Sequence, residues 1–199
     1  MAGDGKARGP YRKGVERRAR ILRAALELFA RTGDRGFSLQ ELADHVGLTQ
    51  QGLMHYFGSR EELLLAVLRE RDRLDAEVSR DIRRPGEGLA QAVRQNMDEP
   101  GLVRLFTSLS AAATDPGHHA HGHFADRYRE LTALITEKLA DQQREGTIRA
   151  DAPAEHMARL LLAAADGLQI QWLLDPSLDM ASVIETLDSM CRALPATDA

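Results

Sequence analysis

The stretch around Gly47 constrains the fold most, because two complete helix starts lie close together there. Ser38 and Glu41 have the spacing of a capping box, in which each side chain can bond the other's backbone amide. Phe37 and Leu42 flank this pair at the positions of a hydrophobic staple. Gly47 then suits the left-handed end of a first helix.

A second helix start follows that turn almost at once. Thr49 can cap the second helix, and Leu48 and Leu53 are placed to form another staple. We therefore expect two short helices, at about 38–46 and 49–56. The turn is too tight for an antiparallel hairpin, so the helices must cross steeply, as in a helix-turn-helix.

The exposed face of the second helix has the chemistry of a DNA-reading surface. Leu53 and Phe57 are four residues apart and point into the small core, and the other positions are polar, neutral or small. No acid is among them; they are Gln50, Gln51, Gly52, His55 and Tyr56. Glutamine can read adenine in the major groove, and hydroxyl groups suit phosphate oxygens. An ordinary corner between two helices remains the alternative.

Charge along the chain is uneven. Residues 1–23 contain eight cations and two acids, which give a net charge of +6. Because the net charge of the whole chain is −4, the remaining residues have a net charge of −10. A basic end on an acidic body suggests a polyanionic partner, although a solvated tail is the alternative. Residues 1–10, rich in glycine, are expected to form a flexible arm.

A third helix start lies just after the second short helix. Ser59 and Glu62 again have capping-box spacing, and a long helix is expected at about 59–83. Arg60 stands in its first turn, where the helix dipole disfavours a cation. A phosphate held jointly by Arg60 and the first amides would explain this placement, with a solvent-exposed arginine as the alternative.

These motifs together resemble the TetR family of bacterial transcriptional regulators. The resemblance covers roughly residues 15–68 and rests on Ile21-Leu22-Arg23-Ala24-Ala25-Leu26-Glu27-Leu28-Phe29, Gly33, Gly36-Phe37-Ser38, Glu41-Leu42-Ala43, Val46-Gly47-Leu48-Thr49 and Tyr56-Phe57-Gly58-Ser59-Arg60-Glu61-Glu62-Leu63. It implies an all-α homodimer without enzymatic activity that binds a palindromic operator in double-stranded DNA. A small effector, expected to be lipophilic, would release the DNA. By motif position, the DNA contacts would be Ser38, Thr49, Gln50, Gln51, His55, Tyr56 and Arg60.

The remaining sequence predicts further helices, about nine in all. These are expected at about 12–32, 87–98, 101–114, 119–145, 152–174 and 179–194, in addition to the three above. The chain would then divide into an arm (1–10), a helix-turn-helix DNA-binding domain (11–58) and an effector-binding and dimerisation domain (59–199).

The last two helices are apolar around much of their circumference, which requires burial on several sides. In the resembled family these helices form a four-helix bundle with the partner subunit, whereas intrachain core is the alternative. The expected dimer residues are Leu161, Ala165, Leu168, Val183, Ile184, Leu187 and Met190. Bulky residues of the middle helices are candidates for the effector pocket, namely Met97, Leu105, Phe106, Phe124, Tyr128 and Trp172.

Other functional classes receive little support. Four histidines, His118, His119, His121 and His123, invite a metal hypothesis, but solvated or pocket-rim histidines are favoured and no metal or cofactor is expected. The single cysteine, Cys191, lies on an apolar stripe and permits no internal disulfide. No phosphate loop or nucleophile motif supports a helical enzyme, and a protein-interaction module is the other alternative. Without an apolar run of about 20 residues no membrane is expected, and a cytoplasmic protein is the default.

Overall fold

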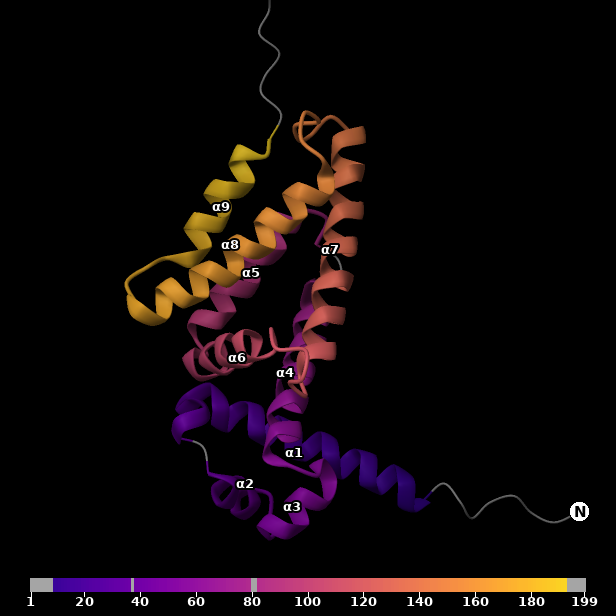
Figure 1. Ribbon diagram of the computed structural model, residues 1–199, viewed down its shortest axis with the longest axis vertical. Coiled ribbons are helices and arrows are strands. Elements are labelled where there is room, and N and C mark those ends of the chain that lie inside the picture. Colours follow the sequence, from indigo (N-terminus) through magenta and orange to yellow (C-terminus); the bar gives the residue numbers. More distant parts are fainter. Residues whose placement is uncertain (1–8, 37, 80–81, 193–199) are drawn as a thin grey trace, which may run out of the picture.

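A computed structural model describes residues 9–36, 38–79 and 82–192, and in this part the chain forms nine α-helices (Figure 1). The prediction of an all-α fold with about nine helices is confirmed. Their bounds are α1 Gly9–Gly36, α2 Leu39–His45, α3 Gln50–Phe57, α4 Arg60–Ser79, α5 Pro85–Met97, α6 Pro100–Ala112, α7 His121–Arg144, α8 Ala154–Leu174 and α9 Met180–Met190.

The three N-terminal helices form one end of the molecule, which we call the head (Figure 1). Helices α2 and α3 lie below α1, and α4 leads from the head toward the other helices. We call α5–α9 the body. In the head, Phe29, Leu42 and Leu53 are fully buried, and Phe57 is nearly so. The small core predicted between the two short helices therefore forms.

Helix α1 is longer than the sequence suggested. The sequence predicted an end near residue 32, yet the helix continues through Gly33 to Gly36. A C-terminal glycine cap needs a positive φ, and among the described residues only Gly47, Gly58 and Gly146 have one. Helix α1 packs along α6, and tertiary packing commonly overrides the weak helix propensity of a single glycine. Residues 9–10 of the predicted arm are also helical, and its first eight lie outside the described residues.

Helix α4 connects the head to the body without a break. Its side chains Leu63, Leu65 and Val67 are buried in a cluster that includes the head core. The same cluster continues into Leu102 and Phe106 of α6. Head and body thus share one continuous hydrophobic core, to which α4 contributes along much of its length.

The body is built around α8, which packs against α7 on one side and against α5 and α9 on the other (Figure 1). Helix α5 begins at Pro85, two residues earlier than predicted, and the missing amide hydrogen of a proline costs nothing at this first position. Two further hydrophobic clusters fill the body: one centres on Trp172, Met180 and Ile184, and the other on Leu139 and Leu161.

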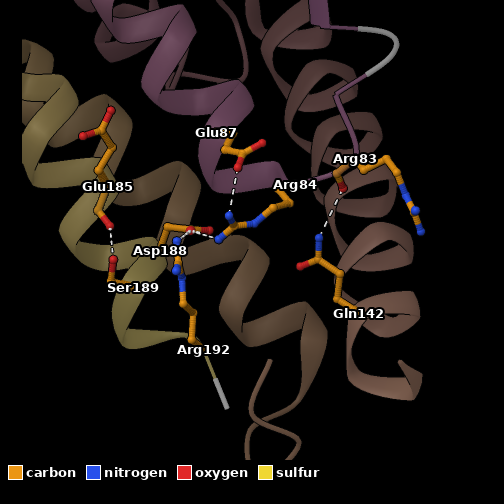
Figure 2. A network of polar contacts seen from close by, with 8 residues as sticks. All are labelled: Arg83, Arg84, Glu87, Gln142, Glu185, Asp188, Ser189 and Arg192. Carbon is orange, nitrogen blue, oxygen red and sulfur yellow. Dashed lines mark hydrogen bonds and ion pairs between the residues drawn. The ribbon is translucent and has the colours of Figure 1, made fainter. Parts of the chain in front are cut away.

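A network of polar contacts connects the first turn of α5 to the end of α9 (Figure 2). Arg84 donates hydrogen bonds to Glu87 and to Asp188 of α9. Asp188 approaches the chain so closely that a Cβ on Gly86 would lie 2.5 Å from two of its carbon atoms. Glycine is therefore required at this position for α5 and α9 to meet as they do.

Candidate functional site

The turn between α2 and α3 has the geometry that the sequence predicted. The Ser38 hydroxyl accepts a hydrogen bond from the Glu41 amide at 2.9 Å. Gly47 has a φ of +66°, in the left-handed region that favours glycine. The Thr49 hydroxyl then accepts from the Gly52 amide at 3.0 Å and begins α3. Local hydrogen bonds thus fix the position of α3 relative to α2.

The outer face of α3 is polar and contains no acidic residue. Gln50, Gln51 and His55 are exposed, and Tyr56 is half-buried against the head core. Ser38 and Thr49 are also exposed, so each hydroxyl lies at the surface while it caps a helix. Arg60 begins α4 and is half-buried, beside the cap that Ser59 provides to the Glu62 amide. The seven predicted DNA contacts therefore gather around α3 and the helix ends next to it.

Two arginines of α1 help to hold this unit together, a role that the sequence analysis did not assign. Arg17 donates a hydrogen bond to the Val46 carbonyl at the end of α2, at 2.7 Å. The Arg18 guanidinium lies 4.9 Å from the centre of the Phe57 ring, within the range of a cation–π contact. Both residues belong to the basic N-terminal region, whose charge alone did not distinguish packing from DNA contact.

A cavity of about 380 Å³ lies in the body between α4, α5, α7 and α8. Its apolar wall includes Leu89, Val93, Leu131, Ile135 and Leu162. A second group of lining residues is charged or polar, namely Arg71, Asp72, Asp75, Arg84, Asn96, Arg127, Lys138, Asp166 and Gln169. An apolar cavity of this size with a few convergent polar groups is typical of a small-molecule site.

Of the six candidate pocket residues, one lines this cavity, one bonds a lining residue, and four lie in hydrophobic core clusters. Phe106 lines it, and Tyr128 donates a hydrogen bond to the lining residue Asp166. Leu105 and Phe124 lie in the core cluster shared with the head. Met97 and Trp172 belong to the cluster between α5, α8 and α9.

Most charged side chains in the cavity wall have a polar partner, within one helix or across two. Arg127 of α7 donates to both carboxylate oxygens of Asp72 on α4 at 3.1 Å. The buried Arg71 donates to Asn96 and lies 3.8 Å from Asp75. Burial lowers the pKa of Arg71 and raises the pKa of Asp75, because the cavity wall disfavours both charged forms.

Asp166 is the exception among these charges. Its partner is the Tyr128 hydroxyl at 2.7 Å, and no arginine or lysine nitrogen of the described residues lies within 4 Å of it. Burial raises the pKa of Asp166, although the Tyr128 hydrogen bond and the charge of Arg127 oppose the shift. Burial, together with Asp166, raises the pKa of Tyr128, which therefore stays protonated and donates.

The polar lining residues were missed by the sequence analysis, which searched the middle helices for bulky apolar side chains. One local signal was available, since Arg71 and Asp75 have the i, i+4 spacing of an ion pair on one helix face. Nothing local marks Asn96, Arg127 or Asp166, because their partners lie 25 to 55 residues away.

The predicted dimer residues divide into buried and exposed groups. Leu161, Ala165, Leu168 and Ile184 are buried within the chain itself. Val183 is 40% exposed and Met190 67% exposed, while Leu187 is half-buried at the edge of a core cluster. Three further apolar side chains of α8 are exposed, namely Leu160, Ile170 and Leu174. An apolar surface on α8 and α9 therefore remains uncovered in the single chain.

The histidines do not converge. His121 bonds the Ala113 carbonyl at 2.8 Å, and the His123 ring nitrogen lies 3.7 Å from Asp72. Within the described residues, no three histidine, cysteine or acidic side chains are grouped so that they could hold a metal ion. The same part of the chain contains no helix that is both long and apolar enough to cross a membrane.

Comparisons with known proteins agree with this arrangement. Residues 21–67 match the family model for bacterial regulatory proteins of the tetR family, and residues 85–196 match the C-terminal domain of BetI-type transcriptional repressors. The chain is 29% identical over 160 residues to the transcriptional repressor AcnR of Corynebacterium efficiens, covering 78% of this chain and 81% of that protein. It is 30% identical over 157 residues to the repressor Rv1474c of Mycobacterium tuberculosis, covering 76% and 80%.

A solved structure is also similar. A transcriptional regulator from Saccharomonospora viridis, in complex with choline, aligns with a TM-score of 0.68 at 25% identity, covering 88% of this chain and 95% of that one. The all-α fold, the helix-turn-helix in the head and the family matches together define a ligand-responsive, DNA-binding transcriptional repressor. The chain belongs to the TetR family. The resemblance found in the sequence is confirmed, as is the prediction that this protein is a regulator and not an enzyme.

Proposed function

We propose that the protein acts in the cytoplasm as a homodimeric repressor of a palindromic operator, from which a small and largely lipophilic effector releases it. The observation that carries this proposal is the path of α4. The helix begins at Arg60, beside the reading face of α3, and its later residues Asp72 and Asp75 line the cavity. One unbroken helix therefore contacts both proposed sites.

In this proposal α3 enters the major groove. Gln50 and Gln51 would contact base edges, together with Thr49 at the start of the helix. Phosphate contacts would come from Ser38, His55, Tyr56 and Arg60. The exposed, acid-free face of α3 supports this assignment, because nothing on it repels the DNA backbone.

The dimer would form through α8 and α9. The exposed side chains Leu160, Ile170, Leu174, Val183 and Met190 supply an apolar surface that a second copy can cover. Leu161, Ala165, Leu168 and Ile184 would support this surface from within, and Leu187 would lie at its edge. Two heads related by a two-fold axis can read half-sites about 34–36 Å apart.

Effector binding would act through α4. Contacts with Asp72 and Asp75, or with Phe106 of α6, would favour a different tilt of the two helices that pack against the head. A change in the separation of the two heads would then weaken DNA binding, as in a two-state equilibrium. The S. viridis regulator solved with choline supports a small molecule as the effector of this chain.

Fluorescence anisotropy with a palindromic fragment from the protein's own promoter tests this function. We expect saturable binding whose affinity falls steeply with salt, as phosphate contacts require. Size-exclusion chromatography with light scattering should give twice the 22.0 kDa chain mass. A monomer, or equal affinity for the palindrome and for a scrambled duplex, would contradict the proposal.

A further inference from the structure

The chemistry of the cavity wall also indicates what kind of effector it accepts. Two polar side chains of α8, Asp166 and Gln169, are three residues apart and line the cavity on the same side of the helix. Both present oxygen atoms that accept hydrogen bonds. Whether the cavity suits a cation or an anion depends on which of its acceptors and donors are unused.

Gln169 has an acceptor without a donor. The residue is 94% buried, and its amide nitrogen donates to the Ala165 carbonyl at 3.4 Å. Since Ala165 offers only an acceptor, this bond fixes which end of the amide is nitrogen and which is oxygen. The Gln169 oxygen is buried and has no hydrogen-bond partner among the described residues. Buried acceptors are normally satisfied, so a donor supplied by a ligand would complete this site.

Asp166 is the cavity acid without a cationic partner. Asp72 is bonded by Arg127, and Asp75 lies beside Arg71. Asp166 has only the Tyr128 hydroxyl, and no nitrogen of an arginine or lysine in the described chain lies within 4 Å. A bound cation would neutralise this carboxylate at close range.

The cavity's own cations, in contrast, already have partners. Arg71 donates to Asn96, Arg127 to Asp72, and Lys138 to the Ile82 carbonyl at 2.6 Å. Arg84 is engaged by Glu87 and Asp188 at the edge of the cavity. An anionic ligand would share these cations with the acceptors that they already hold, whereas a cationic ligand would find Asp166 without a cation and the Gln169 oxygen without a donor.

We propose that the cavity binds a small protonated amine with an apolar body, using Asp166 as its counter-ion and the Gln169 amide oxygen as its second hydrogen-bond acceptor. The apolar body would lie against Leu89, Leu131 and Leu162. This inference rests on the proposed function, because it names the chemical class of the effector. It requires N–H donors, and so it separates amines from quaternary ammonium compounds.

Isothermal titration calorimetry with four matched probes tests the class. Cyclohexylmethylamine supplies the ammonium group, cyclohexylmethanol lacks the charge, the trimethylammonium analogue lacks the N–H donors, and cyclohexanecarboxylate reverses the charge. On the full chain at neutral pH, we expect the primary amine to bind at least about tenfold more tightly than each of the others, the change that 1.4 kcal/mol produces. A tighter carboxylate would overturn the proposal, and an equally tight trimethylammonium probe would overturn the role of Gln169.

Variants test the two residues. Asp166→Asn keeps an acceptor for Tyr128 but removes the charge, and Gln169→Leu removes the unpaired oxygen. We expect each to weaken amine binding about tenfold while alcohol binding changes less than twofold. Glu155→Gln and Gln171→Leu, at exposed positions of the same helix, are the matched controls and should leave amine binding unchanged. Unaltered amine affinity in folded Asp166→Asn, checked by circular dichroism, would contradict the proposal.

The two proposals can fail separately. Operator binding without any amine binding would leave the proposed function intact and refute the amine. Amine binding without operator binding would support the cavity chemistry and refute the proposed function. If both hold, adding the amine to the protein–operator complex should raise the apparent dissociation constant for DNA, and Asp166→Asn should abolish that response at the same amine concentration.

Discussion

The head and the body are specified by contacts of different range. In the head, the hydroxyls of Ser38, Thr49 and Ser59 each bond an amide three residues later, so the helix starts are encoded locally. In the body, the bonds that shape the cavity join residues such as Arg127 and Asp72, which are 55 positions apart. The reading surface therefore depends on short motifs, and the cavity depends on how four helices pack.

This difference predicts that the DNA-reading surface can be altered without loss of the fold. Gln51→Ala combined with Tyr56→Phe removes a proposed base contact and a proposed phosphate contact, while the Tyr56 ring that packs on the head core stays. We expect operator affinity to fall about 100-fold at constant salt, since each such contact contributes about 1–3 kcal/mol. The free energy of unfolding should change by less than about 0.5 kcal/mol, because Gln51 is exposed.

The matched control is Gln95→Ala, which removes an exposed glutamine from α5 in the body. It should leave operator affinity unchanged. Full affinity in the double variant would show that α3 is not the reading helix. A large loss of stability would show that the head surface is less separable from its core than the structure indicates.

In the body, by contrast, a substitution where two helices meet should lower the free energy of unfolding directly. Gly86→Ala places a Cβ 2.5 Å from two carbon atoms of Asp188, which must then move and weaken its contacts with Arg84 (Figure 2). Overpacking of this kind costs about 1–3 kcal/mol, and we expect about 2 kcal/mol by urea denaturation.

Gly88→Ala is the control on the same helix. Its new Cβ would meet only Ile82, at an ordinary distance of 3.7 Å. Alanine also has the higher helix propensity, so we expect stability to be unchanged or slightly raised. Equal destabilisation by both variants would show that the loss of stability comes from alanine within α5 itself and not from the contact between α5 and α9.

The same contrast explains what could be predicted from the sequence. The two short helices were placed within about a residue of their observed bounds, because the capping residues Ser38 and Thr49 mark their starts, and Gly47 and the next helix start at Ser59 mark their ends. The end of α1 was misplaced, because a glycine at position 33 suggests a C-cap, yet Gly33 is not among the described glycines with a positive φ. Short sequence motifs therefore predict a helix end well when hydrogen bonds between neighbouring residues determine that end.

The cavity could not be predicted for the same reason. Its volume lies between four helices, and its polar groups meet only after those helices pack. The partner of Asp166 is Tyr128, which lies on another helix and 38 residues away. Apolar periodicity identified the helices that surround the cavity, yet it contained no information on which charged side chains would face one another across it.

The smallest expected effect concerns the cost of keeping Asp166 in the cavity wall. Burial raises its pKa in the folded protein, so the folded chain holds a proton over a pH range in which the unfolded chain, with a pKa of about 3.9, has released it. Stability therefore falls as the pH rises through that range and stays reduced above it.

Asp166→Asn removes this cost, and the amide oxygen of the substituted side chain can still accept the Tyr128 hydrogen bond. We expect the variant to be more stable than the unaltered chain at pH 7 in urea denaturation, with the difference disappearing as the pH falls below about 4. A variant that is less stable at pH 7 would mean that the ionised carboxylate stabilises the empty body, in which case the cavity would not need a cation to complete it.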